Sequence, residues 1–273
     1  MLDSQRRIRH APPPAGWYLP AVAARTAELD SFDGVEGLVI QGGVNVEVLT
    51  GVSLHGGLVA AWPEPGLTAK LVVERLIGHW QAWGLPSYAQ FDNGTIFQGA
   101  HQWRDNVGRV MRLCLSLGVT PVFAPVAEYG FQAAIESWNG RWQAKVWRRF
   151  HHDSLAALAA RSAAHLAAVR QRGAVRIERA PARRAFPEGW ELDLQTPPAG
   201  ILIFLRRTSD RGDASLLGRT FPVDPLWTHR LVRAEVLLDE GVIHFYALRR
   251  REPTQQPRLA TLAYELPRRP FRG

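Results

Sequence analysis

The chain has 273 residues, of which 46% are hydrophobic and 21% charged, so it is long enough for one large or two modest domains with buried cores. Its 33 basic residues, all but two of them arginines, outnumber the 25 acidic ones, which favours a polyanionic partner or reflects a GC-rich genome. The single cysteine, Cys114, excludes a disulfide framework and a cysteine-based zinc site. The sequence contains neither a run of about 20 apolar residues nor an apolar signal segment, so we expect a cytoplasmic protein without a membrane partner.

The excess positive charge lies in the second half of the chain. Residues 1–150 contain 13 bases and 12 acids, whereas residues 151–273 contain 20 bases and 13 acids. This distribution predicts acid-based chemistry in the first half and contact with a polyanion in the second. Three consecutive prolines begin at Pro12, so we expect residues 1–25 to form a linker or arm.

A predicted catalytic core follows at residues 26–172. Short β-type runs separated by glycines predict three antiparallel strands at residues 29–40, 44–54 and 58–62. Apolar residues at three- and four-residue steps predict an amphipathic helix from Leu67 to Trp83, which ends at Gly84. The remaining pattern predicts a strand at 87–91, a helix at 102–117, a strand at 119–124 and one long helix at 131–172.

The last hundred residues have a different pattern. Residues 173–198 are basic and contain prolines, which predicts a linker. Five short apolar runs then predict strands at residues 200–205, 215–223, 231–237, 242–248 and 260–264. So many short strands in so short a segment predict a small all-β barrel at residues 199–273.

Three acids stand at informative places in the core. Asp30 lies in the first strand, Asp92 ends the fourth, and Glu136 lies near the start of the long helix. Each alone has a structural explanation, such as a turn or a helix-dipole contact. Together they would supply the oxygen ligands that Mg²⁺ or Mn²⁺ requires, and two such ions can activate an attacking oxygen and stabilise a leaving one.

Two motifs carry a resemblance to a known family. The Asp-Asn-Gly-x-x-Phe segment at residues 92–97 and the Gln-x-x-x-Glu-Ser-x-Asn segment at residues 132–139, with the strand and helix order, resemble the catalytic core of retroviral integrases and bacterial insertion-sequence transposases. The resemblance covers roughly residues 25–170. It implies an α/β, ribonuclease-H-like mixed sheet flanked by helices. The predicted barrel resembles, more weakly, the one that follows the core in several integrases.

The resemblance also implies an activity. Asp30, Asp92 and Glu136 would bind two Mg²⁺ or Mn²⁺ ions, and a DNA 3′-hydroxyl would attack a target phosphodiester. The partners would be element ends and target duplex, bound by a homo-oligomer in a bacterial, nucleoid-associated setting. The alternatives are a same-fold nuclease that uses water and a non-catalytic or truncated DNA-binding remnant of a transposase.

The chain departs from the family pattern in three respects. Asp33 competes with Asp30 as the first acid, and the Leu29-Asp30 context favours Asp30. The interval between Asp92 and Glu136 is longer than in retroviral integrases. Only 29 residues precede Asp30, too few for a helix-turn-helix module, so we expect a truncated or split product.

Basic residues near these acids are candidates for DNA contact. Lys145 and Arg149 are four residues apart on the predicted long helix, which predicts a shared face that binds phosphates or is simply solvated. Arg249, Arg250 and Arg251 form the densest basic run of the predicted barrel. The full candidate set for nucleic-acid binding is Asn139, Lys145, Arg148, Arg149, Arg249, Arg250 and Arg251.

Overall fold

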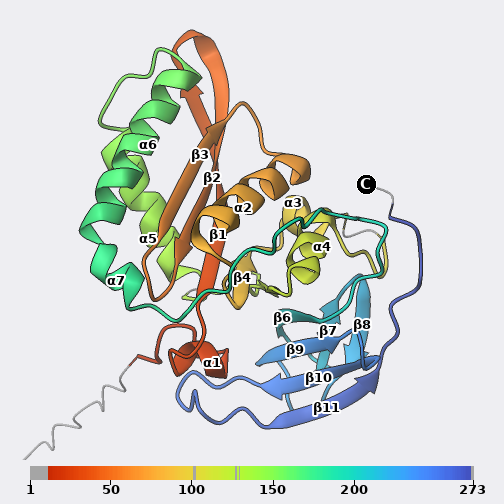
Figure 1. Ribbon diagram of the computed structural model, residues 1–273. Helices are drawn as coiled ribbons and strands as arrows, with labels where there is room; N and C mark the ends of the chain where they lie inside the picture. Colours follow the sequence, from red (N-terminus) through yellow and green to blue (C-terminus); the bar gives the residue numbers. More distant parts are fainter. Residues whose placement is uncertain (1–11, 101–102, 127, 129, 272–273) are drawn as a thin grey trace, which may run out of the picture.

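The computed structural model describes residues 12–100, 103–126, 128 and 130–271. Up to residue 123 its elements are α1 (Pro20–Ala23), β1 (Leu29–Ile40), η1 (Gln41–Gly43), β2 (Val44–Ser53), β3 (Val59–Glu64), α2 (Ala69–Trp83), β4 (Tyr88–Phe91), α3 (Thr95–Gln98), α4 (Arg109–Ser116) and β5 (Thr120–Phe123). The later elements are α5 (Ala133–Trp142), the π-helical turn η2 (Gln143–Trp147), α6 (Leu155–Arg172), α7 (Ala174–Glu178), β6 (Ile201–Arg207), β7 (Asp213–Leu216), β8 (Arg219–Pro222), β9 (Leu231–Leu237), β10 (Val242–Ala247) and β11 (Arg258–Ala263) (Figure 1).

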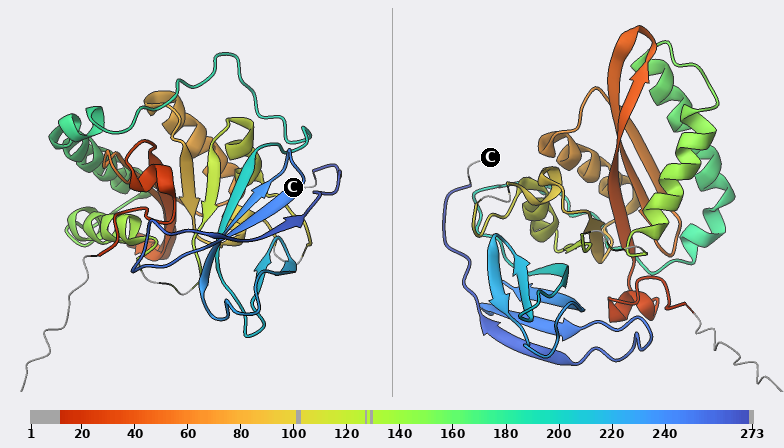
Figure 2. Two further views of the ribbon diagram at one scale, coloured as in Figure 1. Left: turned by 90° about the horizontal axis from the view of Figure 1, so that it is seen from below. Right: turned by 180° about the vertical axis from the view of Figure 1, so that it is seen from behind.

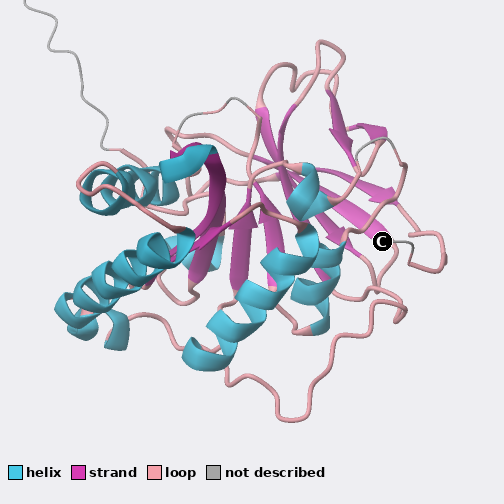
Figure 3. Ribbon diagram, turned by 90° about the horizontal axis from the view of Figure 1, so that it is seen from above, coloured by secondary structure: helices cyan, strands magenta, loops and turns pink. Residues whose placement is uncertain are grey.

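Nine strands form one mixed sheet in the order β11-β10-β9-β6-β5-β4-β1-β2-β3. β1, β2 and β3 are antiparallel neighbours, whereas β4 pairs parallel to β1 and β5 parallel to β4. Helices lie on both faces of this sheet (Figure 3). The predicted mixed α/β sheet flanked by helices is thus confirmed, and the predicted strands of the core agree closely with β1 to β5.

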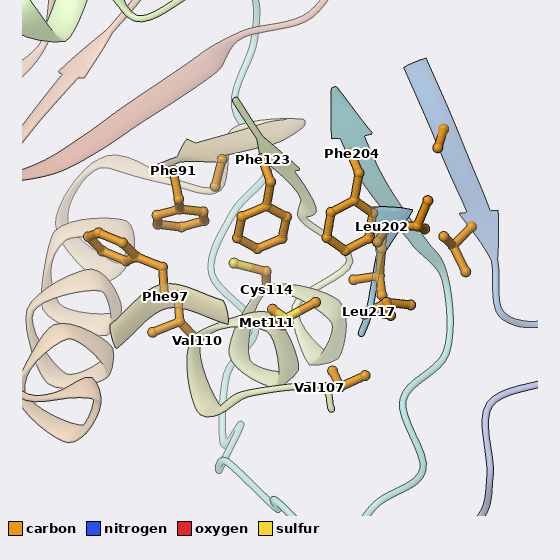
Figure 4. Packing of buried hydrophobic residues seen from close by; sticks show 14 of the residues in the cluster. Phe91, Phe97, Val107, Val110, Met111, Cys114, Phe123, Leu202, Phe204 and Leu217 are labelled. Carbon is orange, nitrogen blue, oxygen red and sulfur yellow. The ribbon is translucent and has the colours of Figure 1, made fainter. Parts of the chain in front are cut away.

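One face of the sheet packs against α2 and α4 through a row of aromatic rings. Phe91 of β4 stacks on Phe32 of β1 at a centroid distance of 5.8 Å and on Phe97 of α3 at 5.0 Å. The row continues through Phe123 of β5 to Phe204 of β6, at 5.1 Å (Figure 4). All five rings are buried, so this row of apolar contacts runs from the core into the C-terminal strands.

The opposite face of β1, β2 and β3 is covered by α5 and α6. Trp138 and Trp142 of α5 are fully buried there with Leu158 of α6. Their indole groups donate to the carbonyl of Ala60 at 2.9 Å and to the hydroxyl of Ser162 at 3.0 Å, so no buried indole N–H is left without a partner in this layer. These contacts hold α5 against β3 and α6 on this face of the sheet, which positions Glu136.

The C-terminal strands continue the core sheet instead of closing a barrel of their own. β6 pairs parallel with β5, and β9, β10 and β11 follow in antiparallel order (Figure 2). Residues 202–205 of β6 are buried on both faces, which requires a position inside a larger sheet. The predicted strand at 215–223 is two strands, β7 and β8, because Leu217 and Gly218 both have positive φ and form the turn of a hairpin.

The segment before β1 is packed rather than extended. Trp17, Tyr18, Leu19 and Val22 are buried against residues of β1, β5 and β6, so this part of the predicted linker or arm packs on the core. Pro20 lies in the first turn of α1, where proline's missing N–H has no helical partner to lose. The rest of the predicted arm, residues 1–11, lies outside the described residues.

Two predicted helices are shorter than expected. The predicted helix at 131–172 is divided into α5, η2 and α6, and Ser154 caps α6 by accepting a hydrogen bond from the Ala157 amide at 3.1 Å. The predicted helix at 102–117 begins only at Arg109; its predicted start at Gln102 lies outside the described residues. In the described ranges, no helix has the length and apolarity needed to cross a membrane.

Candidate active site

The register between β1 and β4 places Asp33 beside Asp92. Ser31 pairs with Gln90 in these parallel strands, and two residues further in the same direction are Asp33 and Asp92. Alternate residues of a strand face opposite sides of the sheet. Phe32 and Phe91 face α2, so Asp33 and Asp92 face the side that α5 covers.

Asp30 is not part of this acid cluster, which corrects the first prediction. It lies three residues from Asp33 in the same strand and therefore faces the opposite side. There it is 1% exposed and forms a salt bridge with Arg183 of the segment predicted as a linker, residues 173–198. The Trp80 indole also donates to its carboxylate at 3.3 Å. Arg183 also donates to the Gly84 carbonyl at 2.9 Å. The ion pair and this hydrogen bond together hold the 173–198 segment against the core.

Asp33 is held by a chain of hydrogen bonds from α5 and β2. The Asn139 amide donates to Oδ2 of Asp33 at 2.7 Å, and the Gly34 backbone N–H donates to Oδ1 at 2.9 Å. Thr50 in turn donates to the Asn139 side-chain oxygen at 2.6 Å. Asn139 was predicted to contact nucleic acid; the structure instead places it 9% exposed on Asp33, where it orients the carboxylate.

The pKa of Asp33 is raised from 3.8 to about 6. Burial is the main cause, and the negative charge of Asp92 is the next. The hydrogen bonds from Gly34 and Asn139 oppose the rise, and the charge of Glu136 adds to it. Asp33, Asp92 and Glu136 are therefore coupled electrostatically, as carboxylates of one cluster are.

Asp92 begins a tight turn that connects β4 to α3. Its Oδ1 accepts from the Gly94 amide at 2.8 Å, and Asn93 donates to the Ala124 carbonyl at 2.5 Å. A Cβ on Gly94 would lie 3.0 Å from Asp92 Oδ1, so the glycine leaves room for the carboxylate. The Asp-Asn-Gly motif thus fixes the second acid and the next strand together.

Glu136 lies in the first turn of α5, and its side chain is exposed. A buried polar contact that the sequence did not point to fixes the start of this helix. Gln90 of β4 donates to the Phe131 carbonyl at 2.9 Å, and the Tyr18 hydroxyl donates to Gln90 at 2.6 Å. Only the position of Gln90, two residues before Asp92 on the same face, could have indicated this role.

The donors of the cluster suit a hard divalent cation, since all are carboxylate oxygens and the negative charges of Asp92 and Glu136 both oppose ionisation of Asp33, which a bound cation would relieve. Asp33 and Asp92 are the two that would hold it, with Glu136 on the helix above. Within the described residues, no group of three or more histidine, cysteine or acidic side chains has the spacing to hold a metal ion. The side chains as they stand therefore provide a pair of ligands and a third, more exposed acid.

The basic candidates lie in two places. Lys145 is in η2, whereas Arg148 and Arg149 follow its end, so the helical spacing that predicted a shared face does not extend to Arg149. Arg250 lies 3.6 Å from Glu128 and stacks over Phe131, in the loop that leads into α5. Arg249 pairs with Glu252 at 3.0 Å, next to the exposed Arg251.

No family model matches the chain, and no curated protein matches it either. Among solved structures, the catalytic core domain of BIV integrase is similar over 51% of this chain and 81% of that one, with 19% identity and a TM-score of 0.39. The HTLV-2 integrase catalytic core domain in complex with magnesium is similar over 44% and 70%, with 13% identity and a TM-score of 0.35. A chain of the simian T-cell lymphotropic virus intasome in complex with PP2A regulatory subunit B56 gamma is similar over 79% and 71%, with 14% identity and a TM-score of 0.45. The mixed α/β fold follows from the strand order and does not depend on these likenesses.

Proposed function

We propose that the chain is a polynucleotidyl transferase that uses divalent metal ions to join a DNA 3′-hydroxyl to a target phosphodiester, as transposases and integrases do. The observation that carries the proposal is the acid cluster: Asp33 and Asp92 lie in register on adjacent parallel strands, under the helix that bears Glu136. The first acid is thus Asp33 rather than Asp30. The partners we propose are element ends and target duplex, bound by a homo-oligomer.

The residues of the chain have separable tasks in this reaction. Asp33 and Asp92 would hold Mg²⁺ or Mn²⁺ with Glu136, and the bound ions would supply activation of the attacking oxygen and neutralisation of charge on the phosphate. Asn139 and Thr50 keep the Asp33 carboxylate in one orientation. The hydrogen bond from Asn139 also favours the charged form of Asp33, which is the form that binds a cation.

The test compares conservative variants in one assay. Asp33→Asn, Asp92→Asn and Glu136→Gln remove a charge while keeping size, so each should abolish Mg²⁺-dependent joining or cleavage of DNA ends. Binding to duplex DNA should be kept, because phosphate contact depends on the basic surface. Activity of Asp33→Asn equal to that of the wild type would exclude the proposed cluster. Inactive wild type with normal DNA binding would favour the non-catalytic remnant.

A further inference from the structure

One acid, Glu128, connects the segment between β5 and α5 to the C-terminal strands. Both Nε and Nη2 of Arg207, the last residue of β6, donate to Oε1 of Glu128, the first at 2.6 Å. The other carboxylate oxygen, Oε2, lies 3.6 Å from Nη2 of Arg250, in the loop after β10. The Glu128 side chain is 16% exposed, so its charge lies largely inside the protein, between two cations.

Arg207 is itself held in place by the sheet. Its backbone pairs with Leu231 of β9, and its Nη1 donates to the His229 carbonyl. All three nitrogens of this guanidinium therefore have a protein partner. A guanidinium held in this way offers its donors to the carboxylate in one fixed geometry. Glu128 is thus attached to a rigid part of the nine-stranded sheet.

Phe131, three residues after Glu128, connects these contacts to the start of α5. Its carbonyl accepts hydrogen bonds from Gln90 at 2.9 Å and from the Tyr18 hydroxyl at 3.2 Å. The guanidinium of Arg250 lies over its ring, 5.1 Å from the centroid. Arg250 therefore contacts both Glu128 and Phe131, which fixes the chain on either side of the two residues between them.

The start of α5 depends on such contacts from outside the helix. Within the described residues, no side chain caps its first turn, and the N-cap residue Gln132 forms no side-chain cap bond. The first hydrogen bond of the helix joins the Glu136 amide to the Gln132 carbonyl at 3.0 Å. The third acid of the cluster thus lies at the point where α5 begins, and the preceding segment determines that point.

We propose that Glu128 is a positioning residue, which places Glu136 by holding the segment before α5 to Arg207 and Arg250. The inference rests on the proposed function, because it says how the third metal ligand of that reaction is placed. Glu128 itself contacts neither metal nor DNA in this account. The C-terminal strands then contribute to metal binding without supplying a ligand.

The first test measures the Mg²⁺ concentration that gives half-maximal joining of DNA ends by the full chain. Loss of groups that orient metal ligands lowers metal affinity about 10- to 100-fold, and Glu128 acts from one step further away. Glu128→Gln and Arg207→Gln should therefore raise this concentration roughly three- to tenfold, with a smaller change in the rate at saturating Mg²⁺. The double variant should equal Glu128→Gln, because the same interaction is lost only once. Arg207→Lys, which keeps the charge, should recover part of the effect.

A matched control is a second ion pair of the same kind. Nε of Arg75 in α2 donates to Oε1 of Glu64 in β3 at 2.6 Å, and the two side chains are exposed to a similar extent as those of Arg207 and Glu128. Glu64→Gln removes the same charge far from the start of α5 in the chain, so the Mg²⁺ requirement should stay at the wild-type value. An equal rise in Glu64→Gln would reflect a general loss of stability and would overturn the proposal.

The second test needs neither metal nor DNA. Hydrogen exchange of the Glu136 amide, followed by NMR, reports on the first hydrogen bond of α5. Arg207→Gln should speed this exchange by about threefold or more, because the segment before the helix is less well held. The Leu158 amide, which forms the corresponding bond of α6 to Ser154, is the internal control and should exchange as in the wild type.

The outcomes separate the two proposals. If the wild type joins DNA and Arg207→Gln needs no more Mg²⁺ than Glu64→Gln does, the positioning role fails and the proposed function stands. If no form of the protein joins DNA, the proposed function fails, and unchanged exchange of the Glu136 amide in Arg207→Gln overturns the positioning role as well. A higher Mg²⁺ requirement together with faster exchange confined to α5 supports it.

Discussion

Two aspartates three residues apart in β1 should respond to the same substitution with opposite changes in stability. The pKa of Asp33 is raised from 3.8 to about 6, so the folded protein binds this proton more tightly than the unfolded chain does. The free energy of unfolding therefore falls as the pH rises from about 3.8 to about 6, and it stays lower at higher pH. At about 1.4 kcal/mol for each pH unit, the ionised Asp33 carboxyl lowers the free energy of unfolding by at most about 3 kcal/mol at neutral pH.

The net effect of Asp33→Asn is smaller than this limit. Asp33 is partly exposed, and solvent reduces the cost of its charge. The new side chain also presents one acceptor in place of two, so either Gly34 or Asn139 loses its acceptor on this residue, at a cost of about 1 kcal/mol. We expect Asp33→Asn to raise the free energy of unfolding by about 1 kcal/mol at neutral pH, and under the proposed function the same variant should be inactive.

Asp30→Asn should have the reverse effect on stability. The substitution removes the negative partner of Arg183, whose side chain is 15% exposed, and leaves that guanidinium inside the protein without its counter-charge. Removing one partner of a buried ion pair in this way lowers the free energy of unfolding by about 3–5 kcal/mol. The position of Asp30 on the α2 face predicts that the residual folded protein still binds Mg²⁺.

Urea unfolding with and without Mg²⁺ measures both effects. Mg²⁺ should stabilise the wild type and Asp30→Asn at about pH 7.5, by RT ln(1 + [Mg²⁺]/Kd), and should leave Asp33→Asn unchanged. The reasoning is refuted if Asp30→Asn loses the Mg²⁺ effect while Asp33→Asn keeps it, since Asp30 would then be the ligand. A large destabilisation by Asp33→Asn would refute the electrostatic account of its pKa.

Three further outcomes are expected. Asn139→Leu removes a hydrogen bond that lowers the pKa of Asp33, so the acidic limb of the pH–activity profile should move to higher pH, as measured by joining rates from about pH 5 to 8. Burial lowers the pKa of His79 to about 4, so stability should rise with pH between about 4 and 6.5; His79→Leu should lower the acid midpoint of unfolding, followed by circular dichroism. Phe204→Ala should lower the free energy of unfolding by about 3–5 kcal/mol. Because Phe204 of β6 stacks on Phe123 of β5, the two halves of the chain should still unfold in a single transition, and two separate transitions would contradict this.

Most of the core could be predicted because its signals are local. Alternation and glycine positions gave strands within one or two residues of β1, β2 and β4, and the Asp-Asn-Gly turn placed Asp92. The break between α5 and α6 also had a local signal, Ser154 as a cap, which a long run of helix-forming residues concealed. The choice of first acid had no such signal.

The choice between Asp30 and Asp33 depends on contacts distant in sequence. Strand alternation requires that the two face opposite sides, but it does not say which side α5 covers. The partner that occupies Asp30, Arg183, is 153 residues away, in a segment predicted to be only a linker. The pairing of β6 with β5 is equally non-local, and in the sequence only the unbroken apolar run at residues 201–205 points to it.

Under the proposed function, the continuity of the sheet would affect how the protein binds two DNA segments. The loop with Arg249, Arg250 and Arg251 follows β10, which is joined to β5 through the backbone hydrogen bonds of β9 and β6. A barrel on a flexible tether would have to be ordered when DNA binds, and that ordering would weaken the affinity. Here the span between that loop and the acid cluster is set by strand spacing. The geometry of the protein, rather than the length of a linker, would therefore determine how far apart two bound DNA segments lie.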